Sequence, residues 1–281
     1  MKYALVTGAA KGIGKAIAIE LAARDYHLLL VDMDELALQT ASKEIAQKYG
    51  VSVAVLCHNL AHQDTAEKIR EWTKPYHQSL TVVVNNAGYG LNGSFCELTL
   101  EEQLDMIDVN IKAQVSLSYI FISILRNAKK SYLLNVCSTT AFQPVPYMNI
   151  YAASKAFILS FNRSLRYELR NSNIVVSYLI PGATDTDFVK RARMQDHTLK
   201  MASRFNMSPT SVAVVAINGT FKEKAAIIPG FSNKLNAFLP KFVPLALVMR
   251  IASSIYGPRK KVPTGILTQT AHLRPKQLNQ H

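Results

Sequence analysis

The chain has 281 residues, of which 49% are hydrophobic and 18% are charged, with 12 glycines and 11 prolines. This composition excludes disorder, collagen-like repeats and disulfide scaffolds, and a chain of this length can bury a core without metal or cross-links. The net charge is +13, all of it from residues 190–281, because residues 1–189 hold 17 basic and 17 acidic side chains. Such a basic region attracts phosphate polymers, anionic lipid or an acidic substrate, and it is equally consistent with a solvated surface.

The cysteines and the apolar runs of the sequence indicate the compartment of the protein and whether it spans a membrane. No CxxC pair occurs among the three cysteines, Cys57, Cys96 and Cys137, which favours a reducing compartment. Only four apolar positions, residues 3–6, precede the first polar turn, too few for a signal peptide. The apolar run at residues 242–249 is much shorter than the roughly 20 residues that span a bilayer. We expect a cytoplasmic chain, with membrane association left open.

Short apolar runs alternate with longer segments of helical period as far as residue 180. The runs predict six strands, at residues 3–6, 27–31, 51–56, 80–84, 132–136 and 174–180. The segments between them predict five helices, at residues 13–23, 35–48, 64–73, 99–125 and 151–169. Strands that are apolar at consecutive positions are typical of a parallel sheet covered on both faces. Right-handed crossovers then predict a doubly wound α/β sheet, with its ligand crevice beyond the carboxyl ends of the strands.

The pattern changes after residue 180. Residues 188–205 are amphipathic and basic, and we expect a mobile lid over the pocket at residues 186–207. Ser208 and Pro209 predict the N-cap and the first turn of another helix. Residues 225–228 predict one further strand.

The C-terminal residues divide at position 257. Residues 231–256 form an apolar extension with scattered basic side chains, in which Pro240 and Pro244 interrupt any long helix. That pattern fits an interfacial helix on a membrane, and packing in a core or against a second subunit explains it as well. Residues 257–281 predict a basic tail. We expect residues 1–256 to form a single domain.

A glycine-rich turn follows the first predicted strand and opens the first predicted helix. Glycines let the backbone turn sharply and approach a pyrophosphate, which then rests on the N–H groups at the helix N-terminus. A glycine triplet alone is a weak signal, and its place in a βαβ unit strengthens it. We expect this turn to contact a dinucleotide through Gly8, Lys11, Gly12, Ile13 and Gly14.

Asp32 supports the same reading independently. It ends the second predicted strand, where a carboxylate can accept hydrogen bonds from both ribose hydroxyls of an adenine dinucleotide. The alternative is an N-cap for the helix that begins at residue 35. A carboxylate here repels a 2′-phosphate and favours NAD(H), whereas Lys11 offers a cation to that phosphate and leaves NADP(H) open. We expect Asp32 to prevail.

Ser138, Tyr151 and Lys155 are the candidates for chemistry. Tyr151 and Lys155 stand four residues apart on one helix face. A free phenol has a pKa near 10, and lowering it by about three units requires roughly 4 kcal/mol. One ammonium at ~4 Å supplies about that much at an effective dielectric of about 20. Ser138, just past the fifth strand, would hold a substrate oxygen while Tyr151 moves its proton.

Two further features contain asparagine. Residues 85–88 read Asn-Asn-Ala-Gly after the fourth strand, where such turns are usually structural. Asn110 lies inside a predicted helix, where its amide competes with the backbone for hydrogen bonds. We expect Asn110 to bridge another group, such as an ordered water.

Together these residues resemble the short-chain dehydrogenase/reductase family. The TGxxxGxG pattern of that family matches residues 7–14, its NNAG pattern matches residues 85–88, and its helical asparagine matches Asn110. Its serine, 13 residues before the tyrosine of YxxxK, and its PGxxxT element at residues 181–186 also match. YxxxK alone is uninformative, whereas five matches in order across roughly residues 1–230 make chance implausible.

The resemblance implies a Rossmann-type sheet of about seven parallel strands and hydride transfer between a nicotinamide and a carbonyl or alcohol. It assigns Tyr151 as the general acid/base and Lys155 to the nicotinamide ribose and the phenol, with Ser138 on the substrate oxygen. Asn110 would hold a water for proton relay. Further cofactor contacts are implied at Asn86, Ala87, Gly88, Pro181, Gly182, Thr184 and Thr186.

The resemblance also implies a homodimer or homotetramer that pairs through the helices predicted at residues 99–125 and 151–169. The chain departs from the family in one place, where many members carry an aspartate after the third strand and this chain has Asn59 and Leu60. An amide oxygen can still accept from the adenine amino group, so weaker discrimination is expected there.

The substrate is less well defined. Five side chains suggest an apolar slot for an acyl chain, a sterol or an aromatic ketone, and packing against loops explains them equally well: Ala141, Phe142, Val145, Met148 and Ile150. Basic residues of the lid could meet an anionic substrate, although a solvated helix face is the simpler reading: Lys190, Arg191 and Arg193. The seven histidines show no ligand spacing, so no metal is expected.

Two alternatives to a soluble dehydrogenase remain. The first is a dinucleotide-sensing binding protein without turnover, which would need the glycine turn and Asp32 but not the catalytic set. The second is the same enzyme attached peripherally to a membrane through its basic C-terminal third. Nucleic-acid binding is not expected, because no RNA-binding signature occurs.

Overall fold

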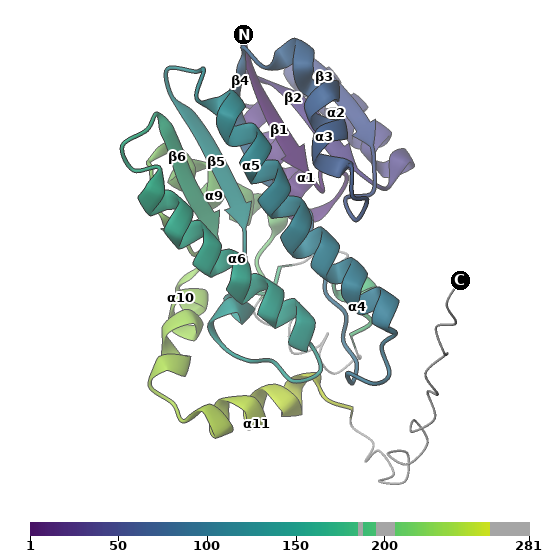
Figure 1. The fold of residues 1–281 in the computed structure, drawn as a ribbon, viewed down its shortest axis with the longest axis vertical. Helices are drawn as coiled ribbons and strands as arrows, with labels where there is room; N and C mark the ends of the chain where they lie inside the picture. The colour runs from purple at the N-terminus through teal and green to yellow at the C-terminus, as the bar shows by residue number, and fades with distance from the viewer. Residues whose placement is uncertain (185–187, 195–205, 259–281) are drawn as a thin grey trace, which may run out of the picture.

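A single twisted sheet with helices on both faces forms the centre of the molecule (Figure 1). The computed structural model describes residues 1–184, 188–194 and 206–258. Seven parallel strands lie in the order β3-β2-β1-β4-β5-β6-β7. They are β1 (Lys2–Thr7), β2 (Tyr26–Asp32), β3 (Val53–Cys57), β4 (Leu80–Asn85), β5 (Ser131–Val136), β6 (Ile174–Leu179) and β7 (Ala226–Ile227). This order confirms the predicted doubly wound sheet, and it reverses between β1 and β4, where such folds bind their ligands.

Two apolar layers hold the helices against the sheet. One face is covered by α1 (Gly12–Ala22), α2 (Glu35–Tyr49) and α9 (Pro209–Phe221). The other face is covered by α3 (Thr65–Thr73), α5 (Gln114–Leu125) and α6 (Asn149–Glu168). Neighbouring residues of one strand serve opposite layers: Ala4 packs in the first layer and Leu5 in the second, and both are fully buried. The continuous apolar runs of the sequence therefore arise because both faces of each strand are covered.

The remaining helices lie beyond the carboxyl edge of the sheet or at its end. They are α4 (Leu100–Ile107), α7 (Phe188–Arg191), α10 (Phe231–Phe238) and α11 (Leu245–Tyr256). Three short 3-10 turns also occur: η1 (Lys74–Tyr76) after α3, η3 (Thr139–Phe142) between β5 and α6, and η4 (Leu239–Lys241) between α10 and α11. Residues 231–256 thus form two helices, and the break between them contains Pro240 and Pro244, as expected from the missing N–H of proline.

One predicted helix differs from the structure. The single helix expected at residues 99–125 is wrong in its middle, where the π-helical turn η2 (Asp108–Ala113) separates α4 from α5. In the segment predicted to be amphipathic at residues 188–205, helix α7 ends at Arg191, and Arg193 has a left-handed backbone with φ +55°. Residues 195–205 of that prediction, and most of the expected lid, lie outside the described residues.

A buried chain of amides crosses the sheet under the second layer. Asn85 donates from Nδ2 to Asn135 Oδ1 at 2.8 Å, and Asn135 Nδ2 donates in turn to Asn162 Oδ1 on α6. Asn162 Nδ2 donates to the carbonyl of Ile158 at 2.7 Å, and all three asparagines are fully buried. Because unsatisfied polar groups are costly in an apolar interior, these bonds fix the position of α6 against β4 and β5.

Asn162→Ala tests this network. The substitution leaves the buried Nδ2 of Asn135 without its acceptor, so the free energy of unfolding should fall by about 1–3 kcal/mol. Asn127→Ala is the matched control, because Asn127 is exposed in the turn after α5 and should change stability by less than about 0.5 kcal/mol. Urea unfolding followed by circular dichroism measures both. If the two variants are equally stable, the amide network does not contribute to the free energy of unfolding, and this prediction is contradicted.

Candidate active site

The glycine turn between β1 and α1 requires glycine for steric reasons. Gly8 and Gly12 have left-handed backbones, with φ of +65° and +56°. A Cβ on Gly14 would lie 1.9 Å from the carbonyl oxygen of Gly8. The turn is held to the loop after β4 by Asn86, whose Nδ2 donates to the carbonyl oxygens of Thr7 and Gly8 at 3.0 Å each. Any side chain at position 14 would therefore push the turn away from the strand.

The N-terminus of α1 faces a large cavity. No side chain caps this helix, and no acidic residue lies in its first turn. Gly12, Ile13 and Gly14 all line the cavity. Backbone N–H groups at an uncapped helix N-terminus, together with the helix dipole, favour an anion, so the chemistry of this end fits a phosphate group.

Asp32 ends β2 at the same edge and lines the same cavity. Its Oδ2 accepts from the backbone N–H of Ala10 at 3.0 Å, and its Oδ1 accepts from the N–H of Asp34 at 3.1 Å. Asp34, not Asp32, is the N-cap of α2, because its side chain accepts from the N–H of Ala37. The alternative that made Asp32 the cap is therefore wrong, and its carboxylate is oriented by the glycine turn.

Lys11 forms an ion pair away from Asp32. Its Nζ lies 2.7 Å from Asp34 Oδ2, and both side chains are substantially exposed. The Lys11 ammonium holds the pKa of Asp34 below its ordinary value, chiefly through this hydrogen bond. The positive charge of Lys11 is thus partly offset at the position where a 2′-phosphate would need it.

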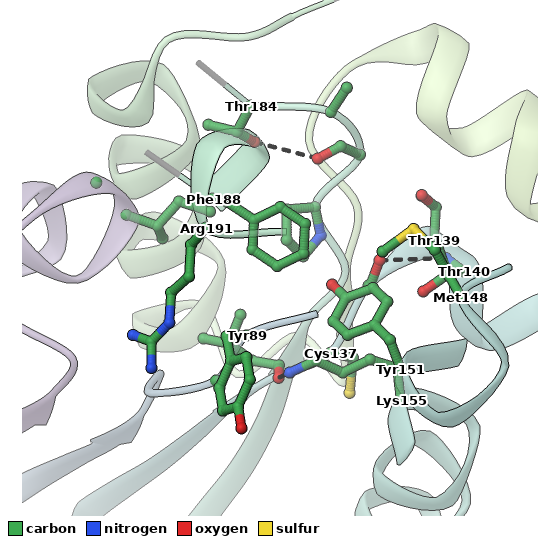
Figure 2. A pocket seen from close by; sticks show the side chains of 18 of the residues that line it. Tyr89, Cys137, Thr139, Thr140, Met148, Tyr151, Lys155, Thr184, Phe188 and Arg191 are labelled. Atoms are coloured by element: carbon green, nitrogen blue, oxygen red, sulfur yellow. Dashed lines mark hydrogen bonds between the residues drawn. The ribbon is translucent and has the colours of Figure 1, made fainter. Parts of the chain in front are cut away.

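Ser138, Tyr151 and Lys155 line the cavity, and each is less than a tenth exposed. Figure 2 shows Tyr151 and Lys155 there. Ser138 caps the turn η3 after β5, with its Oγ accepting from Thr140 N–H at 3.2 Å. Tyr151 and Lys155 project from the first turns of α6. The Nζ of Lys155 donates to the carbonyl of Val136 at 3.1 Å and lies 5.9 Å from the centroid of the Tyr151 ring.

The pKa values of this cluster follow from burial. Burial raises the pKa of Tyr151 to about 12, and hydrogen bonds to Ser138 and Thr140 oppose this only in part. Burial also lowers the pKa of Lys155 to about 8. Burial is the largest influence on the phenol, and the expected lowering of its pKa by Lys155 stays a prediction.

Asn110 forms hydrogen bonds to the loop after β4 and to α6, the helix that carries Tyr151 and Lys155. It is fully buried in the π-helical turn, and its Oδ1 accepts from the N–H of Tyr89 at 3.0 Å. Its Nδ2 donates to the carbonyl of Tyr89 at 2.8 Å and to Ser154 Oγ on α6 at 3.1 Å. A Cβ on Gly88 would lie 2.9 Å from Asn110 Oδ1 and 3.2 Å from Lys155 Nζ. Asn110 therefore fastens the loop after β4 to α6, and its role in holding a water stays a prediction.

The cavity has a volume of about 1310 Å³ and joins the glycine turn to the catalytic cluster. Of the other predicted cofactor contacts, eight line it: Asn59, Leu60, Asn86, Ala87, Gly88, Pro181, Gly182 and Thr184. Thr186 lies outside the described residues. The Oδ1 of Asn59 accepts from the N–H of Ala61 at 3.1 Å, so this oxygen already has one donor. Within the described ranges, no three His, Cys, Asp or Glu side chains gather as a metal site would require.

The predicted apolar slot is right for two residues and wrong for three. Val145 and Met148 line the cavity, whereas Ala141, Phe142 and Ile150 do not. Ala141 and Phe142 pack instead against the small core around Ile158, and Ile150 packs against the second layer. Side chains of one loop point in different directions, and its sequence does not show which ones face the cavity.

Two residues of the segment predicted to cover the pocket, Phe188 and Arg191, line the cavity. The ring of Phe188 on α7 lies 5.3 Å from that of Tyr151, and the guanidinium of Arg191 lies 4.4 Å over the ring of Tyr89 (Figure 2). Arg193 turns away from the cavity and pairs with Glu102 on α4. The C-terminal extension also lines the cavity, through Asn233, Asn236, Leu239, Pro240, Val243, Val248, Ile251, Ala252, Ile255 and Tyr256.

Comparison with known proteins agrees with this geometry. The sequence model of the family described as short chain dehydrogenase matches residues 2–197. The inactive hydroxysteroid dehydrogenase-like protein 1 of Homo sapiens is 32% identical over 183 residues, covering 64% of this chain and 55% of that protein. The very-long-chain 3-oxoacyl-CoA reductase of Mus musculus is 26% identical over 260 residues, covering 90% and 80%. The chain spans about half the length of the first curated relatives it matches.

Solved structures share the fold. A 7β-hydroxysteroid dehydrogenase superposes with a TM-score of 0.81 at 22% identity, covering 90% of this chain and 96% of that one. A short-chain dehydrogenase from Sphingobium yanoikuyae, solved in complex with NADPH, superposes with a TM-score of 0.75 at 24% identity, covering 94% and 99%. At these identities the likeness shows the fold alone.

The buried amine of Lys155 predicts a pH dependence of stability. Its pKa lies at about 8 in the folded protein against 10.5 ordinarily, so the folded state releases this proton first as the pH rises. The unfolded chain then binds more protons, and the free energy of unfolding rises from about pH 8 toward 10.5, by up to about 3 kcal/mol. Urea unfolding at pH 7.5 and 9.5 (roughly the two sides of that window) measures the rise.

Lys155→Met should abolish this rise, because methionine has no proton to release. Lys129→Met is the control, since Lys129 is exposed after α5 and should leave the wild-type slope unchanged. A wild-type slope that persists in Lys155→Met would assign the effect to another group. Cys137 and Tyr151, whose pKa values burial raises to about 12, act with the opposite sign from about pH 9 and pH 10, so both variants and the wild type are compared at the same pH values.

Proposed function

Because the chain belongs to the short chain dehydrogenase family, we propose that it is an oxidoreductase that transfers hydride between a nicotinamide dinucleotide and a carbonyl or alcohol. One observation carries the proposal. Ser138, Tyr151 and Lys155 line the same cavity as the uncapped N-terminus of α1 and the carboxylate of Asp32. A dinucleotide-binding edge and a proton-transfer cluster therefore share one site.

The residues present fit the cofactor. The N–H groups of residues 12–14 would hold its diphosphate, and Asp32 would accept from the adenine ribose hydroxyls. Tyr151 and Lys155 would hold the nicotinamide ribose. When bound, the cofactor supplies the hydride and, when oxidised, a positive charge that favours phenolate. We favour NAD(H), because Asp32 presents a carboxylate and Lys11 is paired with Asp34.

The chain's own residues then move one proton. Tyr151 keeps its proton at neutral pH, since burial raises its pKa, and its hydroxyl is placed to donate to a substrate oxygen during reduction. Ser138, which hydrogen-bonds Tyr151, would hold the same oxygen. Lys155, with a pKa of about 8, is mostly charged at neutral pH and compensates the phenolate left behind. Asn110 holds α6 and the loop after β4 in fixed positions during this proton transfer.

The proposed substrate is an apolar ketone or alcohol, of the size of a sterol or a long acyl chain. Val145, Met148 and Phe188 form one wall beside Tyr151, and α11 forms the opposite apolar wall. The names of the curated relatives refer to hydroxysteroids and to 3-oxoacyl-CoA, which are substrates of this character. Both classes belong in the first panel of test compounds.

A second candidate is a dinucleotide-binding protein without turnover. The human relative that is 32% identical carries the word inactive in its name. This chain nevertheless has the serine, tyrosine, lysine and asparagine together in one buried cluster. That arrangement favours catalysis, because binding alone does not require it.

Tyr151→Phe tests the proposed mechanism. It removes the hydroxyl and keeps the ring, so kcat/KM for reduction of a carbonyl should fall roughly 100- to 10,000-fold, the usual contribution of a general acid. Oxidation of NADH or NADPH with ketosteroids and 3-ketoacyl thioesters measures it, and thermal shift with the cofactor reports binding. Tyr49→Phe on α2, away from the cavity, is the control. Unchanged turnover in Tyr151→Phe would refute the mechanism, and cofactor binding without wild-type turnover on the panel would favour the second candidate.

Asp32→Asn tests the preference for NAD(H). Loss of the charge-assisted hydrogen bonds to the ribose should weaken NADH binding by about tenfold. The difference between the affinities for NADH and NADPH should therefore become smaller. Asp34→Asn is the informative partner, because asparagine still caps α2 while the carboxylate that pairs with Lys11 is gone. That variant should bind NADPH more tightly than the wild type does. Titrations of both cofactors by calorimetry decide the matter, and a wild-type preference for NADPH would overturn the assignment.

A further inference from the structure

Exposed apolar side chains are concentrated in one short part of the chain. Of the nineteen large hydrophobic side chains exposed among the described residues, nine lie in α10, η4, α11 and the residues between them. They are Phe231, Leu235, Phe238, Leu239, Phe242, Leu245, Leu247, Met249 and Ile251. Phe231 and Phe242 are 82% and 83% exposed. We refer to these nine residues as the C-terminal apolar face.

We expect the C-terminal apolar face to contact another surface. Monomeric proteins rarely expose large contiguous apolar patches, and those that occur mark protein or membrane contacts. The cluster is not a failure of local packing, because the same helices bury Ala237, Val248 and Ala252 on their other side. The two helices therefore have an inner side that packs on the protein and an outer side that is apolar as well.

The charged side chains of the segment that carries this face have a single sign. Residues 231–256 contain Lys234, Lys241 and Arg250 and no Asp or Glu. Lys234 on α10 and Arg250 on α11 are both exposed beside the apolar side chains. Apolar residues flanked only by cations complement a surface that is apolar inside and anionic outside, as a bilayer containing acidic lipid is.

The position of the two helices suits an interface. Figure 1 shows α10 and α11 at one end of the molecule, beyond the sheet and the helices that cover it. Within the described ranges, no helix combines the length and the apolar character needed to cross a bilayer. A contact through this face would therefore rest in the plane of the membrane surface.

A second copy of the chain fits the face less well. In a symmetric dimer the same patch meets itself, so Lys234 and Arg250 would meet or approach their own counterparts. Like charges without acidic partners oppose that contact, and the cores of protein interfaces are depleted in charge. An anionic lipid surface can contact both the aromatic side chains and the cations without repulsion between like charges.

The face is also continuous with the cavity. Leu239 and Ile251 are each about half exposed, and both line the cavity. Val243 and Ile255 lie on the same segment and line it too. The segment that presents the apolar face outward thus forms a wall of the proposed substrate site.

We propose that the C-terminal apolar face docks this protein on the surface of a bilayer that contains anionic lipid. Phe231, Phe238 and Phe242 enter the boundary between headgroups and acyl chains, and the basic side chains contact lipid phosphates and carboxylates. Docking places the wall of the cavity formed by α11 against the bilayer. The attachment itself does not depend on catalysis.

Co-sedimentation of the full chain with vesicles tests the proposal. Vesicles of phosphatidylcholine mixed with phosphatidylserine should pellet the protein at low salt, and phosphatidylcholine alone should pellet much less. High salt should reduce the bound fraction, because it screens the attraction to acidic lipid. Failure to pellet with the mixed vesicles at low salt, or equal pelleting with both compositions, would overturn the proposal.

Matched variants locate the contact. Phe242→Asp should lower the partition coefficient by about tenfold or more, whereas Leu36→Asp on α2, at a residue that is 80% exposed, should leave it within about twofold. Lys234→Glu combined with Arg250→Glu should remove the dependence on acidic lipid. Light scattering on the same samples tests the other occupant. A wild-type dimer that Phe242→Asp dissociates, or vesicle binding that Phe242→Asp leaves intact, would contradict membrane docking by this face.

Discussion

The site depends on a junction between two strands that are distant in sequence. Thr7, at the end of β1, accepts from the N–H groups of Asn86 and Ala87 through its hydroxyl oxygen, at 3.1 Å each. Asn86 returns two hydrogen bonds from its side chain to the carbonyls of Thr7 and Gly8. These bonds close the switch point of the sheet, where the strand order reverses. The glycine turn, the loop that leads to Asn110, and hence α6 all take their positions from this junction.

Burial sets the chemistry of the cluster that the junction positions. The same loss of water raises the pKa of Tyr151 and lowers that of Lys155, so each group is driven toward its neutral form. The Nζ of Lys155 lies 5.9 Å from the centroid of the Tyr151 ring, and the phenol keeps its proton at neutral pH. Under the proposed function, the positive charge of an oxidised nicotinamide beside the ring would favour the phenolate.

Sequence patterns with a fixed physical period predicted the fold and much of the site. The parallel strands, the glycine turn and the spacing from Tyr151 to Lys155 follow from local geometry, and the structure places these residues on one edge. The π-helical turn at Asn110 was not predictable, because it depends on bonds to Tyr89 and Ser154, which approach only in the folded chain. The ion pair of Lys11 with Asp34 was not predicted for the same reason. The directions in which Ala141 and Phe142 point were not predicted either.

The sequence predicted a helical C-terminal extension broken near Pro240 and Pro244, but it did not predict that this extension lines the cavity. In α11 the residues Val248 and Ala252 are buried against the protein, while Leu245 and Leu247 are exposed and apolar as well. The apolar residues alone therefore do not show which side of the helix packs on the protein. A segment that is apolar on both sides and basic at intervals satisfies two environments at once. One of these is the protein's own cavity, and the other is the membrane surface proposed above.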